Sequence, residues 1–153
     1  MLLQARFVHT NIVARDWRKL ADFYEGIFGC KPVPPERNLS GSQLEAATGV
    51  PGAELRGIHL RLPGYGEEGP TLEIFSYNRY EERPATAVNR PGIAHIAFLV
   101  NDVSEARRAV LEAGGAAVGE TATLEVGNGA RVTFCYMCDP EGNILELQSW
   151  SGG

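Results

Sequence analysis

Two glutamates of this sequence lie in the same unusual setting, in the middle of short apolar segments. Residues 71–77 read TLEIFSY and residues 144–150 read ILELQSW; both contain Leu-Glu, then an aliphatic residue, and Ser followed by an aromatic residue at matching positions. Alternation along a strand puts Glu73 and Glu146 on the face opposite the flanking leucines and isoleucines. A single glutamate of this kind is ordinarily part of a solvated face. One on each of two matching strands indicates a concave binding surface.

Two histidines extend the repeat. When residues 7–33 are aligned with residues 93–118, His9 falls on His95, and each histidine belongs to the same half of the chain as one of the glutamates. Two imidazoles and two carboxylates form a suitable ligand set for a divalent metal such as Zn, Ni, Co, Mn or Fe. Mixed nitrogen and oxygen ligands are more typical of a catalytic metal site than of a closed structural one. The sequence therefore predicts a metal site formed by His9, Glu73, His95 and Glu146.

Further residues are candidates for contacts with a substrate. His59 and Arg61 share one face of the segment GIHLRLPGY and can meet an anionic group there, although a solvated strand face also explains them. Three aromatic residues follow the glutamates on their strands and can line a pocket, although aromatic residues at strand ends often close a core. The predicted substrate-binding residues are His59, Arg61, Phe75, Tyr77 and Trp150.

Each half of the chain continues from its histidine segment into a predicted helix. Apolar residues recur at three- and four-residue spacing after Asp16 and again after Asp102. An aspartate at this position accepts hydrogen bonds from the free backbone N–H groups of the first turn. Gly29 and Gly114 supply the left-handed conformation that ends many helices. Short β-like segments follow, so both halves are predicted to run strand, helix and then three strands.

The repeat divides one domain, residues 1–153, into two modules. The first module covers about 5–78 and the second about 92–150, and the polar, proline-containing segment 79–91 links them. A chain of 153 residues is long enough for one compact domain with its own core.

The first module carries an insertion, residues 36–54, whose counterpart TATLEVGNG in the second module is shorter. Within it, SGSQLEAAT predicts a short helix that begins at a capping Ser40 or Ser42 and ends at Gly49. Long insertions in compact domains often cover or shape a site, which makes this segment a candidate cover.

The composition, with 44% hydrophobic and 22% charged residues, is that of an ordinary globular protein. A formal net charge of −5 offers no basic surface for nucleic acid. No apolar run approaches the roughly 20 residues that span a bilayer, and MLLQARFVHT does not form a secretion signal, so we expect a cytoplasmic protein. Cys135 and Cys138 form a CxxC, but strand residues three apart point to opposite faces. We therefore expect small buried residues here rather than a redox or zinc pair.

These motifs resemble those of the vicinal oxygen chelate superfamily, and within it those of glyoxalase I and methylmalonyl-CoA epimerase. The resemblance covers nearly the whole chain and is carried by VHTNIVARDWRKLADFYEGIFGC, PTLEIFSYN, GIAHIAFLVNDV and DPEGNILELQSW. It implies an α+β fold in which two tandem βαβββ modules form a curved mixed sheet around a metal site. The same resemblance assigns as metal ligands the first-strand histidine and the last-strand glutamate of each module, which are His9, Glu73, His95 and Glu146.

The resemblance also implies an activity. Similar enzymes use one divalent metal ion to stabilise an enolate while a carboxylate removes and returns the proton next to a carbonyl group. Glu146 and Glu73 are then the candidate base and acid of a glyoxalase-like lyase, isomerase or epimerase. The implied partners are a small-molecule substrate and a second copy of the chain, because the usual state of the family is a homodimer. The four ligands come either from one chain or from two.

Two other functions occur on the same fold. An Fe(II) extradiol dioxygenase uses two histidines and one carboxylate and leaves open positions for catechol and oxygen, so it does not need Glu73. A metal-free binding or resistance protein lacks the ligand set altogether. The complete set of four therefore favours proton transfer over both alternatives.

Overall fold

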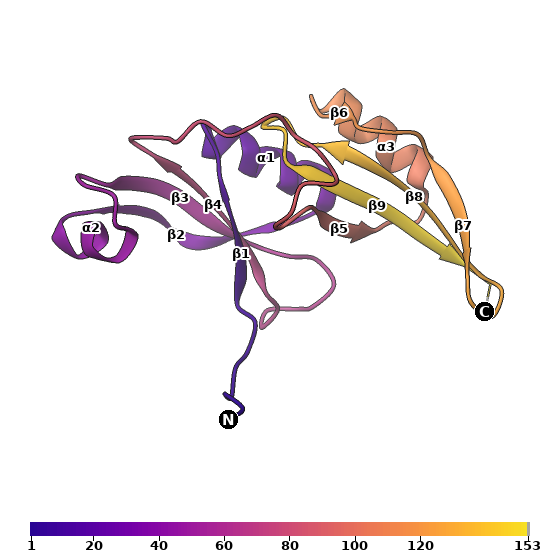
Figure 1. The fold of residues 1–153 in the computed structure, drawn as a ribbon, viewed down its shortest axis with the longest axis horizontal. Coiled ribbons are helices and arrows are strands. Elements are labelled where there is room, and N and C mark those ends of the chain that lie inside the picture. Colours follow the sequence, from indigo (N-terminus) through magenta and orange to yellow (C-terminus); the bar gives the residue numbers. More distant parts are fainter. Residues whose placement is uncertain (153) are drawn as a thin grey trace. The chain divides into compact units, whose positions relative to one another are not determined.

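The computed structural model describes residues 1–152 and separates the chain into two compact units, Met1–Glu82 and the segment that begins at Arg83 (Figure 1). Each unit contains one open sheet of mixed strands with a helix packed on it. The expected α+β fold with two mixed sheets is therefore confirmed. Among the described residues, no helix combines the length and the apolar character needed to cross a membrane.

The first unit is a four-stranded sheet covered by one long helix. Its elements are β1 (His9–Val13), α1 (Trp17–Phe28), β2 (Lys31–Ser40), α2 (Ser42–Thr48), β3 (Glu54–Arg61) and β4 (Thr71–Tyr77). The strand order is β1-β4-β3-β2, in which β1 and β4 are parallel and the other neighbours are antiparallel. The helix α1 packs against β3 and β4 (Figure 1). The central strand β4 therefore lies between the strand that carries His9 and the strand that carries His59.

The second unit repeats this plan. Its elements are β5 (Ile96–Leu99), α3 (Val103–Glu112), β6 (Ala116–Ala117), β7 (Ala122–Val126), β8 (Ala130–Cys138) and β9 (Ile144–Ser151). The strand order is β5-β9-β8-β6, with β7 also paired to β8, and only β5 and β9 are parallel. The helix α3 packs against β8 and β9. The central strand β9, which carries Glu146, therefore corresponds to β4.

The two long helices begin at the predicted aspartates. The Asp16 carboxylate accepts a hydrogen bond from the backbone N–H of Lys19 at 3.1 Å, and the Asp102 carboxylate accepts one from Glu105 at 2.9 Å. Gly29 ends α1 in the left-handed conformation with φ of 68°, as expected. Both N-cap predictions are confirmed. The second helix, α3, has Ala113 as its C-cap residue, and the predicted Gly114 follows it with φ of 91°.

The expected helix at SGSQLEAAT also forms, but its predicted cap is wrong. Gly41 is the N-cap residue of α2 and no side chain caps this end. Neither Ser40 nor Ser42 caps the helix, because Ser40 is still paired with Glu54 in the sheet. Gly49 ends the helix in the left-handed conformation, as expected.

The insertion is smaller than the sequence suggested. Residues 37–40 continue β2 and pair with β3 beyond an irregularity between Val33 and Arg37. In the second unit, β6 pairs with the end of β8 and β7 pairs with its start, and a short break separates them. The two halves of β2 pair with the end and the start of β3 in the same order. β6 and β7 together therefore correspond to the two halves of β2. TATLEV is a strand segment, so only residues 41–53 remain as an insertion.

A separate core lies between the helix and the sheet of each unit. Alternate residues of the central strands are completely buried, which places Glu73 and Glu146 on the opposite faces of these strands. Cys135 belongs to the second core, as expected, whereas Cys138 is half-buried, and the cysteines are free thiols. The largest fully buried side chains of the two cores are Leu20, Tyr24, Leu60, Leu72, Ile74, Val110, Cys135, Met137, Leu145 and Leu147.

Candidate functional site

His9 and Glu73 lie on the same face of two neighbouring parallel strands. The register pairs His9 with Thr71 and Asn11 with Glu73, so the histidine is two residues before the position opposite the glutamate. His9 Nε2 lies 3.7 Å from Glu73 Oε1, and Asn11 Nδ2 donates a hydrogen bond to the same oxygen at 2.9 Å. Asn11 was not among the predicted site residues, although strand alternation places it on the same face as His9.

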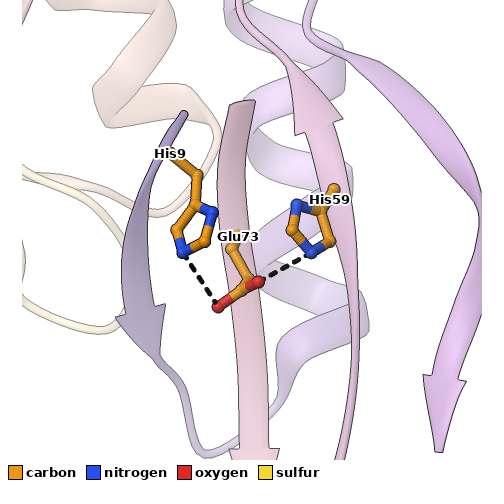
Figure 2. A group of neighbouring side chains, drawn as sticks. All are labelled: His9, His59 and Glu73. Atoms are coloured by element: carbon orange, nitrogen blue, oxygen red, sulfur yellow. Dashed lines mark ion pairs between the residues drawn. The ribbon is translucent and has the colours of Figure 1, made fainter. Parts of the chain in front are cut away.

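His59 approaches the same carboxylate from the other side. It lies on β3 directly opposite Glu73, and its Nε2 is 2.6 Å from Glu73 Oε2. Its second ring nitrogen, Nδ1, lies 3.0 Å from the hydroxyl oxygen of Thr71, a buried residue. Figure 2 shows the two histidine rings on either side of the Glu73 carboxylate. The sequence predicted His59 as a substrate contact, and the structure places it among the donor atoms around Glu73.

The environment of this group disfavours the protonated form of His59. The side chain of Glu73 is 13% exposed and that of His59 is 16% exposed. Burial lowers the pKa of His59 below its ordinary value; Glu73 opposes this effect, and the positive charges of Arg37 and Arg61 add to it. A neutral imidazole retains a lone pair for a metal ion. The metal-binding atoms of His9, His59 and Glu73 all lie within 4.8 Å of one another, so these residues form a possible metal-binding group.

The second unit contains the matching pair. His95 Nε2 lies 2.9 Å from Glu146 Oε2, and the two side chains are 31% and 17% exposed. The register pairs Glu146 with Ala97 on β5 and with Tyr136 on β8. The rings of His95 and Tyr136 are 5.2 Å apart. His95 lies immediately before β5 rather than on it, but each histidine is two residues before the position opposite its glutamate, so the pairs His9–Glu73 and His95–Glu146 occupy equivalent positions in the two units.

The remaining predicted contacts are spread more widely. Phe75 is buried, with its ring 6.1 Å from that of His59. Arg61 lies two residues from His59 and donates a hydrogen bond to the carbonyl oxygen of Gly69. Trp150 is 52% exposed and donates to the side chain of Gln148. It follows Glu146 by four residues, which is about 13 Å of strand. Among these three residues, Phe75 and Arg61 are the ones near His59.

Tyr77 belongs to another part of the first unit. It lines a cleft of about 500 Å³ at the start of α1, together with Arg15, Trp17, Arg18 and Arg56 among others. His9, His59 and Glu73 do not line this cleft. The lining is mixed in charge, because Asp16 and Glu54 accompany the three arginines.

Comparison with known proteins assigns the chain to a family. Residues 6–147 match the model of the Glyoxalase/Bleomycin resistance protein/Dioxygenase superfamily, and the chain belongs to this superfamily. The family membership predicted from the motifs is therefore confirmed. No curated protein matches the chain.

Solved structures agree with this assignment at the level of the fold. A glyoxalase family protein from Bacillus cereus has 20% sequence identity and a TM-score of 0.75, with 99% of this chain and 97% of that chain covered. A glyoxalase family protein from Enterococcus faecalis has 23% identity and a TM-score of 0.58, with coverages of 94% and 96%. A glyoxalase/bleomycin resistance protein/dioxygenase family enzyme from Burkholderia phytofirmans has 15% identity and a TM-score of 0.57, with coverages of 95% and 98%.

Proposed function

We propose that the protein is a divalent-metal-dependent enzyme that transfers a proton next to a carbonyl group, of the lyase, isomerase or epimerase type. The observation that supports this most strongly is the repeated pair, His9 with Glu73 and His95 with Glu146, at equivalent positions in the two units. A structural role in one unit alone does not explain why both units keep an imidazole beside a half-buried carboxylate. The substrate is a small molecule, and the working form is a homodimer.

The donor set fits a divalent transition metal. Imidazole nitrogen and carboxylate oxygen are ligands for Zn, Ni, Co, Mn and Fe, and one ion per site would be held by His9, Glu73, His95 and Glu146. A bound ion would supply Lewis-acid chemistry, stabilising the negative charge that develops on a substrate oxygen. The four side chains would come from one chain or from two chains of the dimer.

The two glutamates would have different roles in the transfer of the proton. Glu73 is engaged by His59 at 2.6 Å and by Asn11 at 2.9 Å, contacts that hold its carboxylate in one orientation. Glu146 pairs with His95, and Ala97 occupies the position beside it that corresponds to Asn11 beside Glu73. We therefore assign proton removal to Glu146, and ligand holding together with proton return to Glu73. Arg61 and Phe75 are the nearest candidates for contact with the substrate.

Metal analysis and solvent deuterium exchange test this proposal. The purified protein should carry or take up one divalent ion per chain and should exchange deuterium into a 2-oxo thioester or a hemithioacetal. Glu146→Gln should reduce the exchange by at least about 100-fold, the lower end of what a general base contributes. Glu125→Gln, the same change at an exposed residue of β7, should leave it unchanged. A wild-type protein that takes up no divalent ion, or unaltered exchange in Glu146→Gln, would refute the proposal.

A second candidate function is an Fe(II) oxygenase. It is favoured by one observation, the composition of the group formed by His9, His59 and Glu73, because two histidines and one carboxylate are typical of non-haem Fe(II) oxygenases. Oxygen consumption with a catechol and Fe(II), in a protein that exchanges no deuterium, would establish this function in place of the first.

A further inference from the structure

The two units differ at one position beside the central carboxylate. His59 lies directly opposite Glu73 on the neighbouring antiparallel strand, and Tyr136 lies directly opposite Glu146. These residues occupy the same place in the repeated plan, but an imidazole is a common metal ligand and a phenol is a much weaker one at neutral pH. The first unit therefore has three good donors. Within residues 83–152, the second unit has two good donors that lie close together, His95 and Glu146.

The three donors of the first unit converge from three adjacent strands. His9 Nε2 lies 3.7 Å from one oxygen of Glu73, and His59 Nε2 lies 2.6 Å from the other. Bond lengths of roughly 2.0–2.2 Å place neighbouring ligand atoms roughly 3–3.5 Å apart around an ion. The first distance is close to this range. The second is a hydrogen-bond distance that has to lengthen by less than about 1 Å when an ion replaces the shared proton.

The second nitrogen of His59 is placed as in a metal-binding histidine. Nδ1 lies 3.0 Å from the hydroxyl of Thr71, and Thr71 is 6% exposed. Ligating histidines almost always use their second nitrogen in this way, because the contact fixes the tautomer and the orientation of the ring. In the absence of an ion, a proton lies between Nε2 and Glu73; when an ion replaces it, a proton on Nδ1 that is donated to Thr71 leaves the Nε2 lone pair for the ion. The group is thus arranged before an ion binds.

We infer that His59 is a metal ligand and that His9, His59 and Glu73 bind a divalent transition ion within the first unit, without His95 or Glu146. This inference deepens the proposed function. It depends on that proposal in one respect, namely that the natural ligand of the protein is a divalent transition ion. It makes the two glutamates unequal. Glu73 stays on the ion when Glu146 leaves it to remove the proton from the substrate, so the ion is retained during that step.

A positioning role is the main alternative for His59. In that role it would orient Glu73 through a hydrogen bond and would not touch the ion. Removal of such a supporting partner weakens metal binding by about 10- to 100-fold, so a larger effect distinguishes a ligand. His59→Gln is the informative change, because the glutamine amide can still donate a hydrogen bond to Glu73 but is a poor ligand for a transition metal.

Binding of Co²⁺ alone to the full chain tests the inference, measured by equilibrium dialysis and by the visible absorption of the bound ion. The first variant combines His95→Gln with Glu146→Gln, and we expect it to retain one Co²⁺ per chain. Adding His59→Gln to this double variant should weaken binding by more than about 100-fold. Tyr136→Phe in the otherwise wild-type chain, the matched change in the second unit, should leave Co²⁺ binding unchanged. Urea unfolding followed by Trp17 fluorescence, in versions of these proteins that also carry Trp150→Phe, confirms that each variant retains a folded first unit.

The outcomes separate the two proposals. A double variant that loses Co²⁺ while the wild type binds it would overturn the first-unit site and leave the proposed function intact. A loss of less than 100-fold on adding His59→Gln would also overturn it, in favour of a positioning role. If the double variant binds Co²⁺ and the wild type exchanges no deuterium with its substrates, the site stands and the proposed reaction fails. A wild type that binds no Co²⁺ would overturn both.

Discussion

Replacing Gly57 with alanine tests a close approach between two strands of the first unit. Gly57 lies on β3 directly opposite Phe75 on β4. A β-carbon at this position would lie 2.0 Å from the carbonyl oxygen of Ile74 and 2.5 Å from Cδ1 of Phe75, whereas ordinary contacts begin at 3.4 Å. Because the Ile74 oxygen is a backbone atom, rotation of a side chain cannot relieve the overlap. The strand β4, which carries Glu73, has to move.

The size of the effect follows from the kind of clash. Overpacking costs about 1–3 kcal/mol, and we expect the upper end because the backbone must shift. For a chain of this length, about 3 kcal/mol corresponds to a decrease of about 6–12 °C in melting temperature. Gly26 is the matched control: it is an exposed residue within α1, and a β-carbon there meets nothing within 4 Å. Alanine at this position should raise the stability by about 0.5–1 kcal/mol, because glycine costs that much in a helix.

Tryptophan fluorescence can follow the first unit selectively. Trp17 is buried in this unit, and Trp150, which is 52% exposed in the second, can be removed by Trp150→Phe. In that background, urea and thermal unfolding of the two alanine variants should shift in opposite directions. A Gly57→Ala variant as stable as its parent, or two shifts of the same sign, would refute the reasoning. Either result would mean that β3 and β4 do not approach each other as described.

Three further predictions concern the elements that hold the site. Asp16→Ala should destabilise the first unit by about 1 kcal/mol, while Asp16→Asn, which retains a capping oxygen, should cost much less; chemical denaturation measures both. Asp139→Ala should destabilise the protein by on the order of 3 kcal/mol. This buried carboxylate accepts hydrogen bonds from the backbone of Glu141 and from the backbone and side chain of Asn143, immediately before β9. An unchanged urea midpoint would contradict this prediction. Burial raises the pKa of the Cys30 thiol to about 11. The folded state therefore disfavours the thiolate, and its stability should be full below about pH 8.5 and decline as the pH rises towards 11. Cys30→Ala should show a smaller decline over this range, and an equal decline in both proteins would contradict the assignment.

The repeated parts of the chain were predictable from the sequence for a physical reason. The capping aspartates, the glycine that ends α1 and the alternation around Glu73 are local signals. Each acts within one turn of helix or a few residues of strand. The repeat then supplied non-local information, because two matching segments with His and Glu imply two matching sites. The structure accordingly contains His9 beside Glu73 and His95 beside Glu146.

The errors concern segments whose structure depends on distant partners. Residues 37–40 and the segment TATLEV were predicted to belong to an insertion and to its shorter counterpart. Residues 37–40 and Ala122–Val126 instead form strands, because β3 and β8 offer them unpaired backbone groups. Serine caps were expected for α2, but the sheet pairing of Ser40 with Glu54 leaves Gly41 as the cap residue. In each case a ladder of hydrogen bonds to a distant strand outweighs a local preference.

The same reasoning explains why the role of His59 was not predicted. A search for repeats gives weight to residues that occur twice, and His59 is matched by Tyr136. Asn11 is likewise matched by Ala97. Both differences lie beside the central carboxylate, and both leave Glu73 with more polar partners than Glu146. The positions that repeat therefore define the chemistry that both units share. In the proposed mechanism, the positions that differ determine which carboxylate stays in place and which one moves a proton.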